Sequence, residues 1–208
     1  MKIRIILAAS ALVAFASYAQ AQIPYPNVGT IAPSNTFTAS ATGDITGYFV
    51  QGGAASGGGA DDLDFVQMID LTTGTSSGWL FDNQTTVAGA SADFGAVTAG
   101  NTLEFQLENV SLGDLILSSI AADSADGDNH AYSVAWGGGT LNGAAIPAGT
   151  YIGMEDEPAS FSDFNYNDDS FVFTDVSSTP TIPEPNSIYL LGSGLLGLVE
   201  YGRRKLRA

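Results

Sequence analysis

Between Thr36 and Val176 the chain alternates short apolar segments with turns rich in Gly, Asn and Asp, and no segment keeps a 3.6-residue apolar period. In several segments the apolar residues occupy every second position, as expected of a strand with one buried face. Many short strands separated by turns predict one all-β domain over 36–176, an antiparallel β-sandwich or jelly roll. An extended lead-in (22–35) precedes it, and a linker (177–182) follows. The predicted strands are Thr36–Ala41, Ile45–Val50, Leu63–Leu71, Trp79–Phe81, Thr102–Leu107, Leu115–Ile120, Ala131–Trp136, Tyr151–Met154 and Phe171–Val176.

Residues 1–21 have the three parts of a secretory signal peptide in the usual order. A short basic start, Met1–Arg4, is followed by the apolar segment Ile5–Ala16. Ala19 and Ala21 then form an A-x-A cleavage site, so we expect a cut after Ala21. The mature chain is therefore predicted to leave the cytoplasm through the Sec export machinery.

Charge is segregated along the chain. All Asp and Glu residues except Glu200 lie between Asp44 and Glu184, whereas no Lys or Arg lies between Gln22 and Glu184. The predicted domain therefore has no Lys or Arg with which its carboxylates could form ion pairs. A chain this acidic is repelled by nucleic acid and by anionic membrane surfaces, which excludes both as ligands. Repulsion among the carboxylates must be offset by high external salt, by their spacing over a solvated surface, or by bound cations. The Lys and Arg residues are Lys2, Arg4, Arg203, Arg204, Lys205 and Arg207.

The C-terminal segment 183–208 has the form of a sorting signal. Its apolar run, Ile188–Val199, spans roughly 18 Å as a helix, which is less than the hydrocarbon core of about 30 Å. We therefore expect a transient anchor in the inner membrane. The basic residues behind it keep the C-terminus cytoplasmic, so the acidic domain lies outside. The motif before the run is Pro183, Glu184 and Pro185, and the membrane-stop residues are Arg203, Arg204, Lys205 and Arg207.

This tail resembles the PEP-CTERM sorting signal. The resemblance lies in Pro183-Glu184-Pro185-Asn186-Ser187, the run Leu190–Leu198 and the Arg-rich end. In that family the signal is processed by exosortase, a membrane-embedded cysteine protease of Gram-negative bacteria that produce exopolysaccharide. The resemblance implies exosortase as a partner, followed by release to the cell surface or to the extracellular matrix of a biofilm.

The body resembles a type that recurs in proteins with this tail. The runs Phe37–Phe49 and Asp126–Ser133 are similar to its opening strands and central segment. Ile146–Asp156 followed by Asp163–Asp168 is similar to its closing signature, which is shared with a surface-protein domain of unknown function for which calcium binding is suspected. The resemblance implies no established activity.

The strongest local group of candidate ligands is Glu155-Asp156 followed by Asp163-x-Asn165-x-Asn167-Asp168-Asp169. Alternating hard oxygen ligands on a tight loop suit Ca²⁺, which takes six to eight oxygens. The first three ligand positions match an EF-hand loop, but Asp168 replaces its Gly and Thr174 replaces its final Glu. We therefore predict a loop site in a β domain. The candidate ligands are Glu155, Asp156, Asp163, Asn165, Asn167 and Asp168.

A second interpretation remains open for these residues, because Asp and Asn also cap the turns of hairpins. Asp123, Asp126 and Asp128 form a weaker second candidate for a cation site. Zinc is disfavoured at both places, since its usual sites need several His or Cys residues. The chain has a single histidine, His130, and no cysteine.

Residues suited to catalysis are scarce. With no Cys, Lys or Arg in the domain, most nucleophilic and oxyanion-binding arrangements are absent, so we predict no catalytic residues and a non-enzymatic protein. Two functional classes remain. The first is a surface or matrix protein associated with exopolysaccharide and stiffened by calcium. The second is a carbohydrate-binding or carbohydrate-acting β-sandwich, in which aromatic side chains stack on sugars unless they pack in the core instead. Those aromatic residues are Trp79, Trp136, Tyr151 and Tyr166.

Overall fold

The structure, a computed structural model, describes residues 23–52 and 62–180. This part of the chain is all-β with antiparallel strands, and its one helical element is the 3-10 turn η1 (Ala121–Asp123). No helix in these two ranges is long and apolar enough to cross a membrane. The strands are β1 Asn35–Ala39, β2 Gly43–Gly52, β3 Asp64–Asp70, β4 Thr75–Ser76, β5 Ser91–Val97, β6 Thr102–Asn109, β7 Leu115–Ser118, β8 Ala131–Trp136, β9 Gly139–Leu141, β10 Ala144–Ile146, β11 Gly149–Met154, β12 Asp169–Phe173 and β13 Val176–Pro180.

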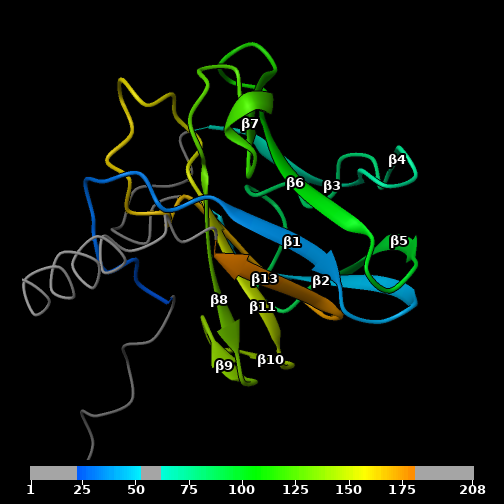
Figure 1. Ribbon diagram of the computed structural model, residues 1–208. Helices are drawn as coiled ribbons and strands as arrows, with labels where there is room; N and C mark the ends of the chain where they lie inside the picture. Colours follow the sequence, from blue (N-terminus) through cyan, green and yellow to red (C-terminus); the bar gives the residue numbers. More distant parts are fainter. Residues whose placement is uncertain (1–22, 53–61, 181–208) are drawn as a thin grey trace, which may run out of the picture.

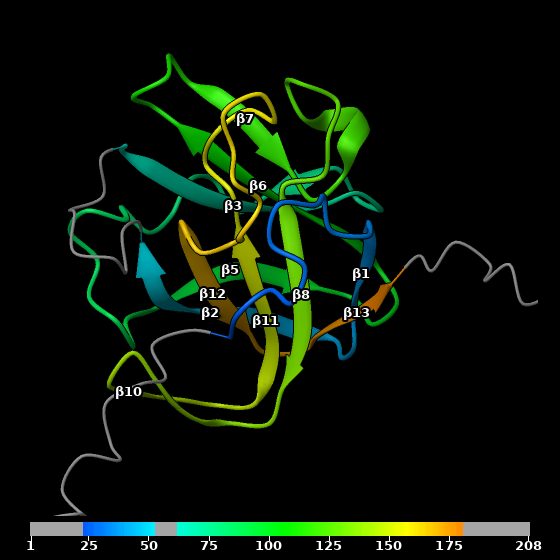
Figure 2. The same ribbon diagram turned by 90° about the vertical axis from the view of Figure 1, so that its left-hand side faces the viewer.

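Two antiparallel sheets pack against each other in a sandwich-like arrangement (Figure 1). The first has the strand order β13-β1-β6-β3-β4, and β7 pairs with β6 beside this path. The second has the order β5-β2-β12-β11-β8. Figure 2 looks onto the second sheet and shows the loop between β11 and β12 at one end, with the β9–β10 hairpin near the other.

The main core lies between the two sheets. Leu103, Phe105 and Leu107 of β6 are buried on one face, as their period-two spacing predicts. Phe171 and Phe173 of β12 meet them from the second sheet, and the rings of Phe105 and Phe173 lie 4.4 Å apart between centroids. Burial of these side chains is the main stabilising term of the fold.

The second sheet is also covered on its outer face. Leu141 and Ile146 of the β9–β10 hairpin pack with Val50, Tyr151 and Val172 in a smaller apolar cluster. Strand β12 is consequently buried along its whole length. This explains why all three residues of its apolar segment, 171–173, are buried rather than every second one.

The prediction of an all-β domain is confirmed, but β4, β5, β9 and β10 were not among the predicted strands. Residues 131–136 form β8 as predicted, whereas Trp79–Phe81 contributes only an isolated bridge between Leu80 and Val66. Strand β5 was not predicted, because its two large apolar residues, Phe94 and Val97, are three positions apart and give no alternation with a period of two. Residues 177–180 were assigned to the linker, but they pair with β1 as part of β13. Because this pairing is made by backbone hydrogen bonds, the small polar side chains of 177–180 carry no pattern from which it could be predicted.

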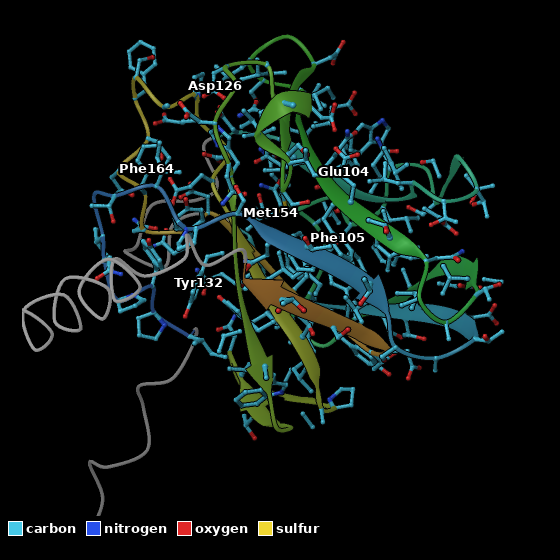
Figure 3. All side chains as sticks on the ribbon, in the orientation of Figure 1. Glu104, Phe105, Asp126, Tyr132, Met154 and Phe164 are labelled. Atoms are coloured by element: carbon cyan, nitrogen blue, oxygen red, sulfur yellow. The ribbon has the colours of Figure 1, made fainter. Side chains whose placement is uncertain are left out.

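The lead-in packs against the body of the protein. Tyr25 is buried between Tyr132 and Tyr166, with ring centroids 4.9 and 4.8 Å away. The backbone N–H of Ala32 donates to the hydroxyl of Tyr166 at 2.7 Å. Figure 3 shows Tyr132 and Phe164 on the side of the molecule that the lead-in crosses. Residues 23–34 are thus held by the loop between β11 and β12 together with Tyr132 of β8 and Asn129 before it.

The two predicted sorting signals lie outside the described residues. The first is the signal peptide, with Ala19 and Ala21. The second is the C-terminal segment, with Pro183, Glu184, Pro185 and the basic residues Arg203, Arg204, Lys205 and Arg207. Both stay predictions from the sequence.

Candidate metal centre

Three carboxylates from both sheets converge at one end of the sandwich. Asp64 is the first residue of β3, Asp169 is the first residue of β12, and Asp156 follows the end of β11. One carboxylate oxygen from each lies within 4.8 Å of the others, and Asp64 and Asp169 are fully buried. Pairing of Met154 with Asp169 in the β11–β12 ladder places the last two segments side by side. We call Asp64, Asp156 and Asp169 the carboxylate cluster.

Asp169 is the most unusual member of the cluster. Both of its carboxylate oxygens are buried, and no N–H or hydroxyl group among the described residues donates to them. Its polar neighbours are carboxyl groups, above all Asp64, and a hydrogen bond between the two requires a proton on one of them. Buried polar groups in proteins almost always have partners, and an unpaired buried carboxylate costs several kcal/mol. The cluster therefore needs cations or protons.

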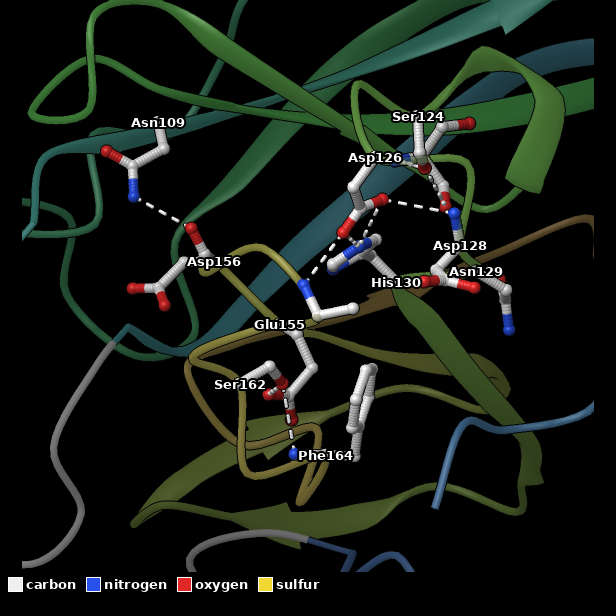
Figure 4. A network of polar contacts seen from close by, with 12 residues as sticks. Asn109, Ser124, Asp126, Asp128, Asn129, His130, Glu155, Asp156, Ser162 and Phe164 are labelled. Carbon is white, nitrogen blue, oxygen red and sulfur yellow. Dashed lines mark hydrogen bonds and ion pairs between the residues drawn. The ribbon is translucent and has the colours of Figure 1, made fainter. Parts of the chain in front are cut away.

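Amide side chains orient the carboxylates around the cluster. Asn83 Nδ2 donates to Asp64 Oδ2 at 2.8 Å, so only the other Asp64 oxygen lacks a partner. Asn109 Nδ2 donates to Asp62 Oδ2 and to the backbone oxygen of Asp156, both at 2.8 Å. Figure 4 shows Asn109 above the backbone of Asp156. These amides act as supporting groups that hold candidate ligands in place.

The electrostatics of the cluster favour protonation in the absence of a cation. Burial, followed by the charges of Asp62 and Asp168, raises the pKa of Asp64 to about 7. Burial and the Asp64 charge raise the pKa of Asp156 to about 7, and burial and the Asp156 charge raise that of Asp168 to about 8. Burial and the surrounding carboxylates raise the pKa of Asp169 well above its usual value.

Without divalent cations, stability is expected to fall as the pH rises. Each raised pKa means that the folded state holds protons that the unfolded chain, with pKa values near 4, has lost. For Asp64, Asp156 and Asp168, whose pKa values are raised to about 7, 7 and 8, this stabilisation is complete below about pH 4 and disappears as the pH passes about 8. In chelator we expect the melting temperature to drop by at least about 5 °C between pH 5 and pH 8. Thermal melts at fixed ionic strength measure it, and a melting temperature that rises over this range would contradict it.

The structure separates the six predicted ligands into two groups. Asp156 belongs to the carboxylate cluster, and Asp168 lies beside it, accepting from the backbone N–H of Asp156 at 3.3 Å. The other four stabilise the loop between β11 and β12. Asp163 Oδ1 accepts from Asn165 N at 3.1 Å, and Asn165 Oδ1 accepts from Asn167 N at 2.9 Å. These contacts are the turn chemistry that was the open alternative.

Glu155 also organises the loop. Its fully buried carboxylate accepts hydrogen bonds from the Ser162 hydroxyl and from the backbone N–H of Tyr166. Burial, followed by the Asp168 charge, raises the pKa of Glu155 to about 7. Glu155 thus sets the path of the chain that brings Asp168 and Asp169 to the cluster.

The weaker candidate, Asp123 with Asp126 and Asp128, has a different arrangement. Asp126 Oδ2 lies 3.0 Å from His130 Nε2 and accepts from the backbone N–H of Ala159 at 2.8 Å (Figure 4). Burial alone would raise the pKa of Asp126, but the donated N–H groups and His130 outweigh it and lower the pKa. His130 is fully buried beside it. Asp126 therefore has partners that Asp169 lacks.

The four aromatic residues considered for sugar stacking differ in burial. Tyr151 and Tyr166 are buried, with exposed fractions of 0% and 1%. Tyr151 packs under the β9–β10 hairpin, and Tyr166 packs against Tyr25. Both rings therefore belong to packed clusters, while Trp79 and Trp136 are half-buried. The two tyrosines offer no face to a polysaccharide.

The fold and the carboxylate cluster together define a broad class, an all-β protein with a candidate cation site between its two sheets. Comparison with protein-family models, with curated proteins and with solved structures found no match to the chain. Its function is therefore inferred from its own residues.

Proposed function

We propose that this chain is an exported, non-enzymatic protein of the cell surface or exopolysaccharide matrix, whose single β-sandwich domain is locked by a bound calcium ion. The observation that supports a bound cation is Asp169, a fully buried carboxylate that accepts no hydrogen bond from an N–H or hydroxyl group among the described residues and lies beside the carboxyl groups of Asp64 and Asp156. Residues 23–180 contain no Lys or Arg, so no such side chain of the domain can neutralise the cluster. A divalent cation supplies the charge that these residues require.

The ligand chemistry favours calcium among common cations. Asp64, Asp156 and Asp169 offer hard oxygens only, and Asp168 adds a fourth carboxylate beside them. Calcium accepts six to eight oxygens in flexible geometry, whereas magnesium demands a near-octahedral shell and keeps several waters. Zinc and copper prefer nitrogen or sulfur ligands. The only described imidazole, that of His130, contacts Asp126 instead.

The role of the cation follows from where its ligands lie. Asp64 belongs to the first sheet, and Asp156 and Asp169 belong to segments of the second. An ion held by all three joins the sheets at one end and secures the loop between β11 and β12. Asn83 and Asn109 would keep their carboxylate and backbone partners aligned with it.

Direct binding tests the cation. The full chain in mild detergent is titrated with Ca²⁺, Mg²⁺ and Zn²⁺ by calorimetry, and melted in each cation and in chelator. At a concentration of about 1,000 times Kd, binding adds about 4 kcal/mol to the free energy of unfolding. Calcium should then raise the melting temperature by on the order of 10 °C. Equal melting temperatures in calcium and in chelator, with no heat of binding, would reject the proposal. A larger effect of zinc would reject calcium as the ion.

Export and processing are tested at the tail. The resemblance of 183–208 to the exosortase signal supports a chain that is anchored briefly in the inner membrane and then released. Replacing Glu184 by Ala should leave most of the protein unprocessed in the membrane fraction of the native host, because the protease no longer recognises its motif. Fractionation and intact-mass measurement show this, with Thr181→Ala in the predicted linker as the control. Unchanged secretion and mass would rule out exosortase processing.

A further inference from the structure

The carboxylate cluster forms only when the chain folds. Asp64 lies far from Asp156 and Asp169 in the sequence and reaches them through the packing of the two sheets. A cation that needs all three therefore binds the folded chain and has little affinity for the unfolded one. By mass action, the stability that the cation adds depends on its free concentration around the protein.

Folding without the cation brings like charges together. Asp62, Asp64, Asp156, Asp168 and Asp169 lie close enough to raise one another's electrostatic energy. No Lys or Arg in residues 23–180 offsets this repulsion. The two fully buried members cannot relieve it by turning toward water. The closed end of the sandwich is thus the part of the described fold that is costly to assemble without a cation.

The same loop holds the lead-in. Between Asp156 and Asp168, the backbone oxygen of Asp163 accepts from Gly29 N at 3.0 Å, and the hydroxyl of Tyr166 accepts from Ala32 N at 2.7 Å. Residues 23–34 therefore lose part of their docking contacts when this loop opens, although Asn129 and Tyr132 also contact them. They follow closely on the signal peptide predicted for 1–21, so in an exported chain they emerge early at the outer side of the membrane.

We propose that cation binding at the carboxylate cluster couples folding of the domain to export. Where free calcium is scarce, as in the cytoplasm, the loop between β11 and β12 and residues 23–34 stay open, which suits a chain that must pass the Sec machinery unfolded. Outside, calcium binds and closes them. This inference rests on the proposed export and cation binding. It adds that calcium binds weakly, with a Kd of about 10⁻⁵ to 10⁻³ M. Extracellular calcium modules bind at the weak end of this range, whereas cytosolic calcium buffers bind far more tightly.

Hydrogen exchange over a calcium series tests the coupling. The full chain in mild detergent is held at 25 °C and pH 7.5 in calcium buffers from about 10⁻⁷ to 10⁻² M, spanning the range of known sites. Amides of 23–34 and 155–169 should become at least about tenfold better protected, with one shared midpoint between about 10⁻⁵ and 10⁻³ M. The core strand β6 should gain less. Magnesium serves as the matched divalent control.

The outcomes separate the two proposals. Calcium binding by calorimetry with protection unchanged, or with a midpoint below about 10⁻⁶ M, overturns the folding switch and leaves the cation site standing. No calcium binding overturns both. The variant D169N gives a second measurement, because removing the charge should protect both segments in chelator to within about twofold of the calcium-bound wild-type chain. Segments that stay open in D169N and in calcium-loaded wild type alike would also overturn the switch.

Discussion

Replacing Asp169 by Asn is expected to abolish the calcium-dependent rise in melting temperature, a loss on the order of 10 °C. The substitution keeps the shape of the side chain but removes a buried charge that has no donor among the described residues. In chelator the variant should melt above the wild type, because its amide can donate to Asp64 instead of repelling it. Scanning calorimetry in calcium and in chelator measures both effects.

The matched control is Asp163→Asn. Asp163 was a predicted ligand, but its oxygens accept from Asn165 within the loop. This variant should retain at least about three quarters of the calcium-dependent shift, because it leaves the carboxylate cluster intact. If Asp163→Asn lost the calcium-dependent shift in melting temperature and Asp169→Asn kept it, the cation site would lie in the loop between β11 and β12 instead of at the carboxylate cluster.

Adding one methyl group at Gly153 is expected to cost about 3 kcal/mol in the free energy of unfolding. Gly153 lies in β11, and a Cβ there would clash with the backbone oxygen of Tyr166. Because the obstructing atom is backbone, no change of rotamer relieves the clash, and the loop must lift. Tyr166 sits two residues before Asp168, so we expect calcium affinity to weaken by at least about tenfold. Denaturant melts and calorimetry provide the two readouts.

Gly137→Ala is the control for this substitution. A Cβ at Gly137 would meet nothing within 4 Å, and its backbone is not in the left-handed region. The change should alter the free energy of unfolding by no more than about 0.5 kcal/mol and leave calcium affinity unchanged. If Gly153→Ala behaves like Gly137→Ala, the loop is not seated on β11 as the structure places it.

Strands with a strong apolar signal were predicted, and those without one were missed. Alternation in β6 and the aromatic residues of β8 identified both, since one face of each packs on apolar neighbours. Strand β5 has its two large apolar residues, Phe94 and Val97, three positions apart with a glycine in the left-handed region between them at Gly95, and β9 and β10 are short. Their pairing depends on backbone groups, which carry no side-chain signal.

Some residues of the candidate site were also predicted from the sequence, and others were missed. Asp156 and Asp168 were predicted because they stand in a dense acidic run, as does the neighbouring Asp169. Asp64 was missed, since a single carboxylate before an apolar strand has no feature that distinguishes it from a surface residue. Asp163, Asn165 and Asn167 were grouped with the ligands because turn residues and calcium ligands are the same residue types.

Residue spacing along the chain was enough to establish an all-β protein, because a period of two apolar positions is a local property of each strand. Charge content was enough to show that the domain must manage unpaired carboxylates, because no Lys or Arg is present in residues 23–180. Which carboxylates meet depended on the packing of the two sheets. Asp64 and Asp169 belong to different sheets and become neighbours only when the core between them closes, so no local pattern records their contact.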